Sequence, residues 1–328
     1  QIKNSTIYSI KKYNKNNKPD WNNFVSNSRN GTFLFNRDFM DYHSEKFSDY
    51  SLLIYKGEKL IALLPANLIN DQLFSHSGLS YGGFIFDDQS KYKDVVEVFK
   101  LTLEMLSKNN ISTLNYKCIP NIYHLSPADE SKHILFKLNA KLIKTELLSV
   151  VKQNRMSLSK DRNSGLSRGV KNNLVIKEVN EFDDFWNLLL IPNLKRKHNV
   201  VPVHSIEEIS LLKNKFKNNI RQFNVYHDKD LIAGATIFET KTTAHVQYIS
   251  SNSTKNKLGS LDFLFNHLIK NTFSNKSFFD FGNSNEENGE KLNKGLMYWK
   301  EGFGAKSVSQ DFYKIETLNF INLDNLFI

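Results

Sequence analysis

The stretch from Ser277 to Ile315 constrains the fold most, because strand and helix patterns alternate in it and glycines stand at the joins. Gly282 follows an aromatic strand pattern and precedes a polar loop. Gly302 and Gly304 follow a helical pattern and can adopt the positive φ that ends a helix. The expected elements are a strand over 278–281, a helix over about 289–301 and a last strand over 307–315. This order predicts an α/β fold.

The length of 328 residues favours two domains. No apolar run approaches the roughly 18 residues that a membrane-spanning helix needs. Residues 1–18 are polar, and we expect no signal peptide there. Cys118 is the single cysteine, which excludes an intrachain disulfide and a cysteine-based metal site. We therefore expect a cytoplasmic protein without a metal cofactor, and its oligomeric state stays open.

The composition is basic, with a formal net charge of +10. Such an excess of positive charge favours anionic partners. The lysines and arginines are scattered among asparagines rather than gathered in one run. We therefore expect phosphorylated cofactors and nucleotide sugars as partners, and neither nucleic acid nor a membrane.

Two segments of the chain match each other, which indicates an internal duplication. Tyr55–Ala62 and Tyr226–Ala233 both read as a strand, a polar turn and a second strand. Between the two copies, the chain becomes polar and basic from Asn154 onwards. Placing the boundary there gives two domains, over 1–155 and 156–328.

The sequence Met297-Tyr298-Trp299-Lys300-Glu301-Gly302-Phe303 closes the expected helix. It resembles the Leu-Tyr-x-Lys-x-Gly-Phe signature of the GNAT superfamily of acyl-CoA N-acyltransferases. In that superfamily the tyrosine often protonates the departing coenzyme A thiolate, and the resemblance gives that role to Tyr298. The alternative is that Tyr298 is a half-buried helix residue whose hydroxyl faces water.

A tandem pair of GNAT-like units is the architecture of the Fem-type aminoacyl transferases and of their acyl-CoA-using relatives encoded among surface-polysaccharide genes. The chain resembles most the sugar N-acyltransferases that modify dTDP-linked 3-amino-3,6-dideoxyhexoses. The phrases that carry this resemblance are 39–43, 51–53, 62–67, 75–83 and 300–305. It implies an α/β fold with two tandem GNAT-like domains, mixed sheets flanked by helices, and an acyl-CoA site in the second domain.

The resemblance also implies where the acyl donor binds. In GNAT proteins a splayed strand binds pantetheine through its backbone, and the following loop and helix N-terminus bind the pyrophosphate. The matching residues are Ile249, Ser250, Ser251, Lys255, Lys257, Gly259 and Ser260. The stretch departs from the family pattern Gln/Arg-x-x-Gly-x-Gly/Ala, which is reduced to Asn256-Lys257-Leu258-Gly259-Ser260-Leu261. A solvated basic loop that caps a helix is the alternative.

Two residues are candidates for the base that deprotonates the acceptor amine. Asp280 alternates with Phe279 and Phe281, and a carboxylate among aromatic side chains is costly to bury unpaired. His204 is the rival, because histidine titrates near neutral pH. The alternatives are a structural ion pair for Asp280 and a position before a helix N-cap for His204.

Five residues are candidates for contacts with the acceptor. Tyr81 lies in a Gly/Ser-rich loop and could stack on a nucleotide base or a sugar. Asn283 and Trp299 flank the expected catalytic helix, and Arg168 and Lys171 could bind a diphosphate. The alternatives are a packing role for Tyr81 and a solvated linker helix for the two basic residues.

The expected activity is transfer of an acetyl or hydroxyacyl group from acyl-CoA to the amine of a dTDP-linked amino-dideoxy sugar, as in O-antigen or capsule biosynthesis. One alternative is a Fem-type transferase that uses aminoacyl-tRNA and a peptidoglycan precursor. Another is a non-catalytic binding module on a GNAT scaffold. Motifs of P-loop kinases, zinc proteases, serine hydrolases and dinucleotide-binding enzymes are absent from the sequence. The acyl chain, the sugar and the nucleotide stay open.

Overall fold

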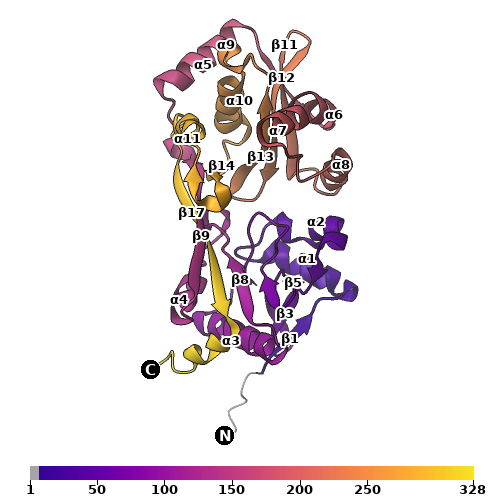
Figure 1. Ribbon diagram of the computed structural model, residues 1–328, viewed down its shortest axis with the longest axis vertical. Coiled ribbons are helices and arrows are strands. Elements are labelled where there is room, and N and C mark those ends of the chain that lie inside the picture. The colour runs from indigo at the N-terminus through magenta and orange to yellow at the C-terminus, as the bar shows by residue number, and fades with distance from the viewer. Residues whose placement is uncertain (1–6) are drawn as a thin grey trace. The chain divides into compact units, whose positions relative to one another are not determined.

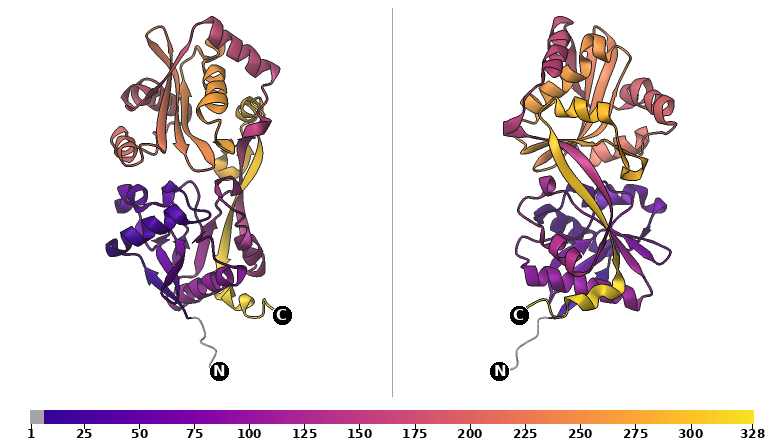
Figure 2. Two further views of the ribbon diagram at one scale, coloured as in Figure 1. Left: turned by 180° about the vertical axis from the view of Figure 1, so that it is seen from behind. Right: turned by 60° about the vertical axis from the view of Figure 1, so that its left-hand side comes forward.

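The computed structural model describes residues 7–328, apart from the side chain of His43. The chain divides into two compact units, shown in Figures 1 and 2. The first unit runs to Thr145 and also includes Ser309–Ile328, and the second unit is Glu146–Val308. The domain boundary predicted between residues 155 and 156 therefore differs from the division of the structure, which falls after Thr145 and again before Ser309. The difference arises because two long strands run from one unit into the other, while the polar segment after Asn154 folds as a helix of the second unit.

The first unit contains two sheets, in the strand orders β1-β3-β4-β7 and β9-β17-β8-β6-β5-β2. A core of leucine, valine, isoleucine and aromatic side chains joins the strands to helix α3. The strands are β1 (Tyr8–Lys12), β2 (Ser48–Asp49), β3 (Leu52–Lys56), β4 (Lys59–Leu64), β5 (Asn67–Ile69), β6 (Gln72–Phe74), β7 (Ile85–Phe86), β8 (Thr113–Lys117), β9 (Lys141–Lys152) and β17 (Lys306–Glu316). The helices are α1 (Lys18–Asn27), α2 (Arg37–Met40), α3 (Tyr92–Lys108) and α4 (Glu130–Lys137).

The second unit is built on a sheet in the order β10-β11-β12-β13-β14-β9. Figures 1 and 2 show α5 and α10 over one face of this sheet, and α6, α7 and α8 over the other. The remaining strands are β10 (Val175–Val179), β11 (Ile220–His227), β12 (Asp230–Glu239), β13 (Thr243–Ser251), β14 (Phe278–Asn283), β15 (Asn285–Glu286) and β16 (Lys291–Leu292). The helices are α5 (Lys160–Lys171), α6 (Asp183–Phe185), α7 (Ile191–His198), α8 (Ile206–Lys215), α9 (Lys255–Leu258), α10 (Ser260–His267) and α11 (Lys294–Glu301).

The duplication expected from the sequence is visible in the hairpins of the two units. In the first unit Ile54 pairs with Ala62 and Tyr55 with Leu60, so the register shifts at one residue of β4. In the second unit Val225 pairs with Ala233 and Tyr226 with Leu231, which is the same shift at the equivalent place in β12. A shared β-bulge is a specific feature of strand pairing. The two units therefore repeat one supersecondary structure.

The parallel strands β13 and β14 separate soon after they meet. They pair over three residues, and the last pair is His245 with Asp280. Beyond it, β13 continues along β12 to Ser251, with a register shift that leaves Gln247 as a bulge. Gly282 has a φ of 72° and turns β14 away. The edge of β13 that faces β14 is therefore left without a strand partner after His245.

Among residues 7–328, no helix is long and apolar enough to cross a membrane.

Two glycines allow α5 to pack closely on α10. A Cβ added at Gly165 would overlap the carboxylate of Asp262, and one added at Gly169 would overlap the ring of Phe263. A Cβ added at Gly259, which precedes α10 with a φ of 70°, would overlap the Gly165 carbonyl. Because no side chain fits between them, the two helices come into direct contact.

We predict that Gly165→Ala destabilises the second unit by about 1–3 kcal/mol, because overpacking forces the two helices apart. Gly295→Ala is the matched control, since a Cβ added there would lie 3.7 Å from Asn293 Oδ1, which is ordinary van der Waals contact. In the helix α11 that change should be neutral or stabilising by up to about 1 kcal/mol. Thermal denaturation of the two variants measures the difference, and equal melting temperatures would contradict this packing.

Candidate functional site

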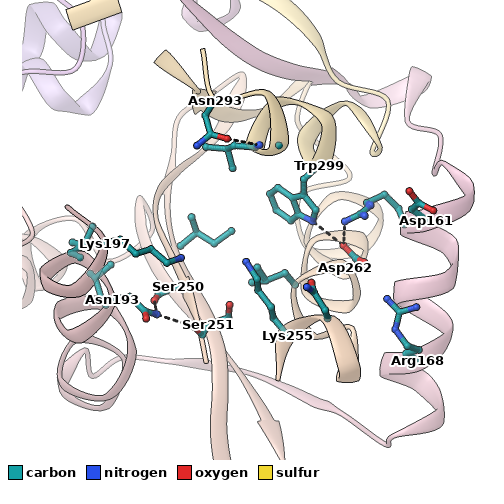
Figure 3. A pocket seen from close by; sticks show the side chains of 18 of the residues that line it. Asp161, Arg168, Asn193, Lys197, Ser250, Ser251, Lys255, Asp262, Asn293 and Trp299 are labelled. Carbon is teal, nitrogen blue, oxygen red and sulfur yellow. Dashed lines mark hydrogen bonds and ion pairs between the residues drawn. The ribbon is translucent and has the colours of Figure 1, made fainter. Parts of the chain in front are cut away.

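A cavity of about 780 Å³ lies within the second unit, where β13 has lost its strand partner. Its walls come from the end of β13, from α5, α7, α9 and α11, and from the start of α10 (Figure 3). Residues that line it include Asp161, Arg162, Arg168, Asn193, Lys197, Ile249, Ser250, Ser251, Lys255, Asp262, Leu296 and Trp299. This volume lies within the range of cofactor sites, about 300–1,000 Å³.

The β13 wall is held by Asn193 of α7. Its side-chain amide donates to Ser250 Oγ at 2.7 Å and to the Ser251 carbonyl at 2.8 Å. The Ser250 hydroxyl in turn donates to the Leu189 carbonyl at 2.9 Å. These bonds fix the strand end in the orientation that exposes Ile249 and Ser251 to the cavity. These three hydrogen bonds therefore hold the backbone of the strand end in place.

The cavity contains positive charges that no carboxylate neutralises. Lys197 and Lys255 both line it, and neither forms an ion pair with any described residue. Burial lowers the pKa of Lys197, and the charges of Lys255 and Arg196 lower it further. Arg168 adds a guanidinium whose Nε is buried without a partner. Like charges that repel one another are stabilised by a bound anion, so this wall fits phosphate groups.

The opposite wall contains an acidic residue that sequence analysis missed. Asp262 accepts from Arg162 Nη1 at 2.7 Å and from Trp299 Nε1 at 2.9 Å. Burial raises its pKa, against the lowering effect of the indole N–H and of Arg162. Asp262 thus ties α5, α10 and α11 together at the cavity wall. The one signal in the sequence was its position in the first turn of the helix after Gly259 and Ser260.

The structure brings together part of the predicted donor site. Ile249, Ser250, Ser251 and Lys255 line the cavity, and so do Arg168 and Trp299, which were assigned to the acceptor. The other predicted residues do not line it. Lys257 and Lys171 are exposed, Ser260 is buried, and Gly259 packs against α5.

Tyr298 lies beside the cavity rather than in it. Its side chain is 60% exposed, and its hydroxyl donates to Asp161 Oδ2 at 2.8 Å. This hydrogen bond and the charge of Asp161 raise the pKa of Tyr298, which keeps the phenol protonated. Asp161 itself lines the cavity. The hydroxyl of Tyr298 is therefore linked to the cavity wall by one hydrogen bond, to Asp161.

The two candidate bases lie outside the cavity lining. Asp280 is fully buried, and its carboxylate accepts from His245 Nδ1 at 2.9 Å and from the Gly282 N–H at 2.7 Å. His204 is 5% exposed and its Nδ1 lies 2.6 Å from the Tyr248 hydroxyl. Both side chains therefore have hydrogen-bond partners within the protein. Asp280 is therefore paired with a histidine that the sequence did not single out.

The remaining acceptor candidates lie apart from the cavity. Asn283 is exposed and donates to Glu146 Oε2 at 2.8 Å. Tyr81 belongs to the first unit, where it is 4% exposed and its ring lies 4.5 Å from that of Tyr123. Its hydroxyl is 2.9 Å from Thr32 Oγ1. These contacts correspond to the packing role that the sequence left open for Tyr81.

The first unit contains a similar strand pair, but a loop fills the gap beside it. Its parallel strands β6 and β8 also pair over three residues, ending at Phe74 and Asn115. Ser75 then donates its N–H to the Asn115 carbonyl and accepts the Lys117 N–H. The apolar cavity left there measures about 110 Å³, which is too small for a nucleotide cofactor. The large cavity accordingly lies in the second unit.

Lys300 holds the separated strand in place. Its side chain is buried, and Nζ donates to the carbonyls of Gly282 at 3.1 Å and Asn283 at 2.6 Å. Both carbonyls belong to the residues where β14 turns away from β13. Burial lowers the pKa of Lys300 to about 8, although the charge of Asp280 acts in the opposite direction. The lysine of the Met297–Phe303 sequence thus has a structural role.

Solved structures with the same architecture were found by structural comparison. FemX superposes with a TM-score of 0.66 at 10% identity, over 96% of this chain and 99% of that one. A tandem GNAT protein from the clavulanic acid biosynthesis pathway gives 0.51 at 12% identity, over 95% and 99%. L-PGS from Bacillus licheniformis gives 0.56 at 10% identity, over 95% and 96%. No family model and no curated protein matches the sequence. The predicted fold of two tandem GNAT-like units is confirmed.

We predict that Lys300 makes the stability of the protein rise with pH between about 8 and 10.5. In this window the unfolded chain holds a proton on residue 300 that the folded chain has released, so higher pH favours the folded state. The lowered pKa corresponds to on the order of 3 kcal/mol across the window.

Urea denaturation at several pH values measures this slope. Lys300→Met should be less stable at every pH, because two carbonyls lose their donor, and should lack the part of the slope due to residue 300. Lys294→Met, at an exposed position of the same helix, should keep the wild-type slope. A slope that survives in Lys300→Met would contradict the assignment.

Proposed function

We propose that this protein is an N-acyltransferase that binds acyl-CoA in the cavity of the second unit. The observation that carries the proposal is the open edge of β13 beside a wall of unpaired cations. A strand edge without a partner offers N–H and C=O groups to the amide-rich pantetheine arm. Lys197, Lys255 and Arg168 offer charge to the diphosphate.

The reaction requires the amine to attack the thioester carbonyl directly while both substrates are bound. Hydrogen-bond donors on the rim of the cavity hold the thioester in a fixed orientation. The amine then reacts with an oriented, bound thioester instead of meeting it by free collision in solution. Backbone N–H groups near Ile249 stabilise the oxygen that becomes negative in the transition state. Tyr298 is the proposed proton source for the leaving thiolate, directly or through Asp161.

The proposed acceptor is the amine of a dTDP-linked amino-dideoxy sugar. This part of the proposal is supported by the sequence phrases that resemble dTDP-sugar N-acyltransferases. The positive net charge of +10 suits an acceptor that also carries a diphosphate. A panel of dTDP-amino sugars with acetyl-CoA, assayed by release of free thiol, tests it. Transfer to none of them would redirect the search to other amines.

We predict that coenzyme A raises the melting temperature of the protein. A ligand at about 100 times its Kd stabilises the native state by about 2.7 kcal/mol. Lys255→Ala should weaken coenzyme A binding by roughly 10–100-fold, since a hydrogen bond to a charged group contributes about 1.5–3 kcal/mol.

Lys257→Ala is the matched control, because Lys257 is also exposed and lies on the same short helix but does not line the cavity. Its coenzyme A affinity should stay within about twofold of wild type, as expected of a surface change. Equal losses in the two variants would mean that the basic loop attracts anions without a defined site. No shift in the wild-type protein at millimolar coenzyme A would overturn the proposed donor.

A second candidate donor is aminoacyl-tRNA, as in Fem-type transferases. The observation that favours it is the last turn of α7, which carries Lys195, Arg196, Lys197 and His198. This is more positive charge than one diphosphate requires, and it suits a nucleic-acid backbone. The thermal-shift assay separates the donors. A shift with aminoacyl-tRNA and none with coenzyme A would favour the Fem-type reaction, whereas binding of coenzyme A without transfer would favour a binding module.

We predict that Tyr298→Phe lowers kcat at least about tenfold and leaves the KM for acyl-CoA nearly unchanged. Help from a general acid is typically about 10²–10⁴-fold, and it acts in the transition state alone. The loss should shrink with an activated thioester whose thiol leaves readily. Asp161→Asn keeps the phenol of Tyr298 but removes its charged partner. It therefore separates direct proton donation by Tyr298 from donation through Asp161. Full activity of Tyr298→Phe on acetyl-CoA would make water the proton source.

A further inference from the structure

His245 and Asp280 form a hydrogen-bonded pair on the sheet face opposite α10. Ala244 and Val246 belong to the core under α10, so His245 between them points to the other face. The same argument applies to Asp280, whose neighbours Phe279 and Phe281 also belong to that core. The two residues face each other across the last pair of β13 and β14. They therefore stand at the point where the strands separate.

The hydrogen bonds of Asp280 determine the tautomer of His245. Oδ2 of Asp280 lies 2.9 Å from His245 Nδ1, and Oδ1 accepts the Gly282 N–H at 2.7 Å. A carboxylate accepts hydrogen bonds and donates none, so Nδ1 of His245 carries the proton. In the neutral ring, Nε2 then holds a lone pair that can accept a proton.

The Nε2 side of the ring is open. No described residue forms a hydrogen bond with Nε2, although the side chain of His245 is 19% exposed and Asp280 fixes the ring from the other side. Gly282 leaves space beside it. A Cβ added there would lie 3.5 Å from His245 Cε1 and 4.0 Å from the Val246 carbonyl, with no other atom as near. A small polar group can therefore approach the ring at this place.

We propose that Nε2 of His245 accepts a proton from the acceptor amine, and that Asp280 is the positioning residue that orients the ring. This inference rests on the proposed N-acyltransferase function. The donor cavity reaches β13 at Ile249, Ser250 and Ser251, and helices from both faces of the sheet line it. His245 lies nearer the start of the same strand, at its last pair with β14, and points to the face opposite α10. The amine accordingly approaches the thioester along the unpaired β13 edge, from the end at His245.

The proton transfers balance in this arrangement. The ammonium of the acceptor gives one proton to His245 Nε2 and becomes a nucleophilic amine. Its nitrogen then bonds to the thioester carbonyl carbon, and the C–S bond breaks as the tetrahedral intermediate collapses. The second proton on that nitrogen passes to the leaving sulfur through Tyr298 or solvent. His245 releases the first proton to bulk water, so that one amide, one thiol and one free proton are formed.

The test compares His245→Gln with wild type, using acetyl-CoA and the panel of dTDP-amino sugars. Glutamine keeps polarity and similar size but cannot take up a proton, so kcat should fall by about 10²–10⁴-fold. The KM for acetyl-CoA and the melting shift with coenzyme A should stay within about twofold, because the residue acts on the acceptor alone. His267→Gln, at an exposed position of α10, is the control and should keep wild-type kcat.

Two further variants distinguish proton transfer from packing. His245→Ala should regain part of its rate when imidazole is added, since free imidazole can occupy the space and accept the proton. Asp280→Asn should lower kcat, and the double variant Asp280→Asn with His245→Gln should be no slower than His245→Gln alone, because both act through one ring. Fully additive losses, or no rescue by imidazole, would overturn the proposed role.

Failure of this inference differs from failure of the proposed function. Active wild type with an equally active His245→Gln overturns the role of His245 and leaves the acyltransferase intact. A wild type that neither binds coenzyme A nor releases thiol overturns both. Nitrogen-15 NMR of labelled histidine adds a measurement that needs no acceptor. It should find His245 protonated at Nδ1 in the neutral ring, and a proton at Nε2 would contradict the proposal.

Discussion

The second unit depends on the buried amino group of one lysine. Lys300 Nζ binds the carbonyls of Gly282 and Asn283, which are the residues where β14 leaves its parallel partner. Without a donor at this place, the buried Gly282 carbonyl and the partly buried Asn283 carbonyl would lose their partner, and the strand would gain by pairing with β13 again. The unpaired edge of β13, the cavity beside it and the partly exposed ring of His245 all lie at that separation. The lysine of the sequence signature therefore supports the site without touching it.

Duplication explains the fold, and local differences explain why the two units have different cavities. Both units share a bulged hairpin and a parallel strand pair of three residues. In the first unit the chain folds back after β6 and fills the gap through Ser75. In the second unit a short helix and α10 follow β13, and α5 packs on α10 through two glycines. The large cavity persists where helices, rather than a loop, follow the separated strand.

Sequence reasoning predicted the elements better than the contacts. The strand patterns at 278–281 and 307–315 correspond to β14 and β17, because alternating apolar residues report burial directly. The helix expected from about 289 begins at Lys294, since the β15–β16 hairpin occupies the residues before it. The predicted domain boundary differs from the division of the structure after Thr145 and before Ser309, because strands that continue from one unit into the other leave no compositional signal. Asp262 and His245 were missed because their importance comes from partners that are distant in sequence.

We propose that the acyl donor lies along the unpaired edge of β13 in the second unit. A crystal structure of the protein soaked with coenzyme A tests it most directly. We expect the pantetheine arm to bond to the backbone of Ile249–Ser251 and the diphosphate to lie against Lys197 and Lys255. Coenzyme A bound elsewhere, with the cavity unchanged, would contradict the account.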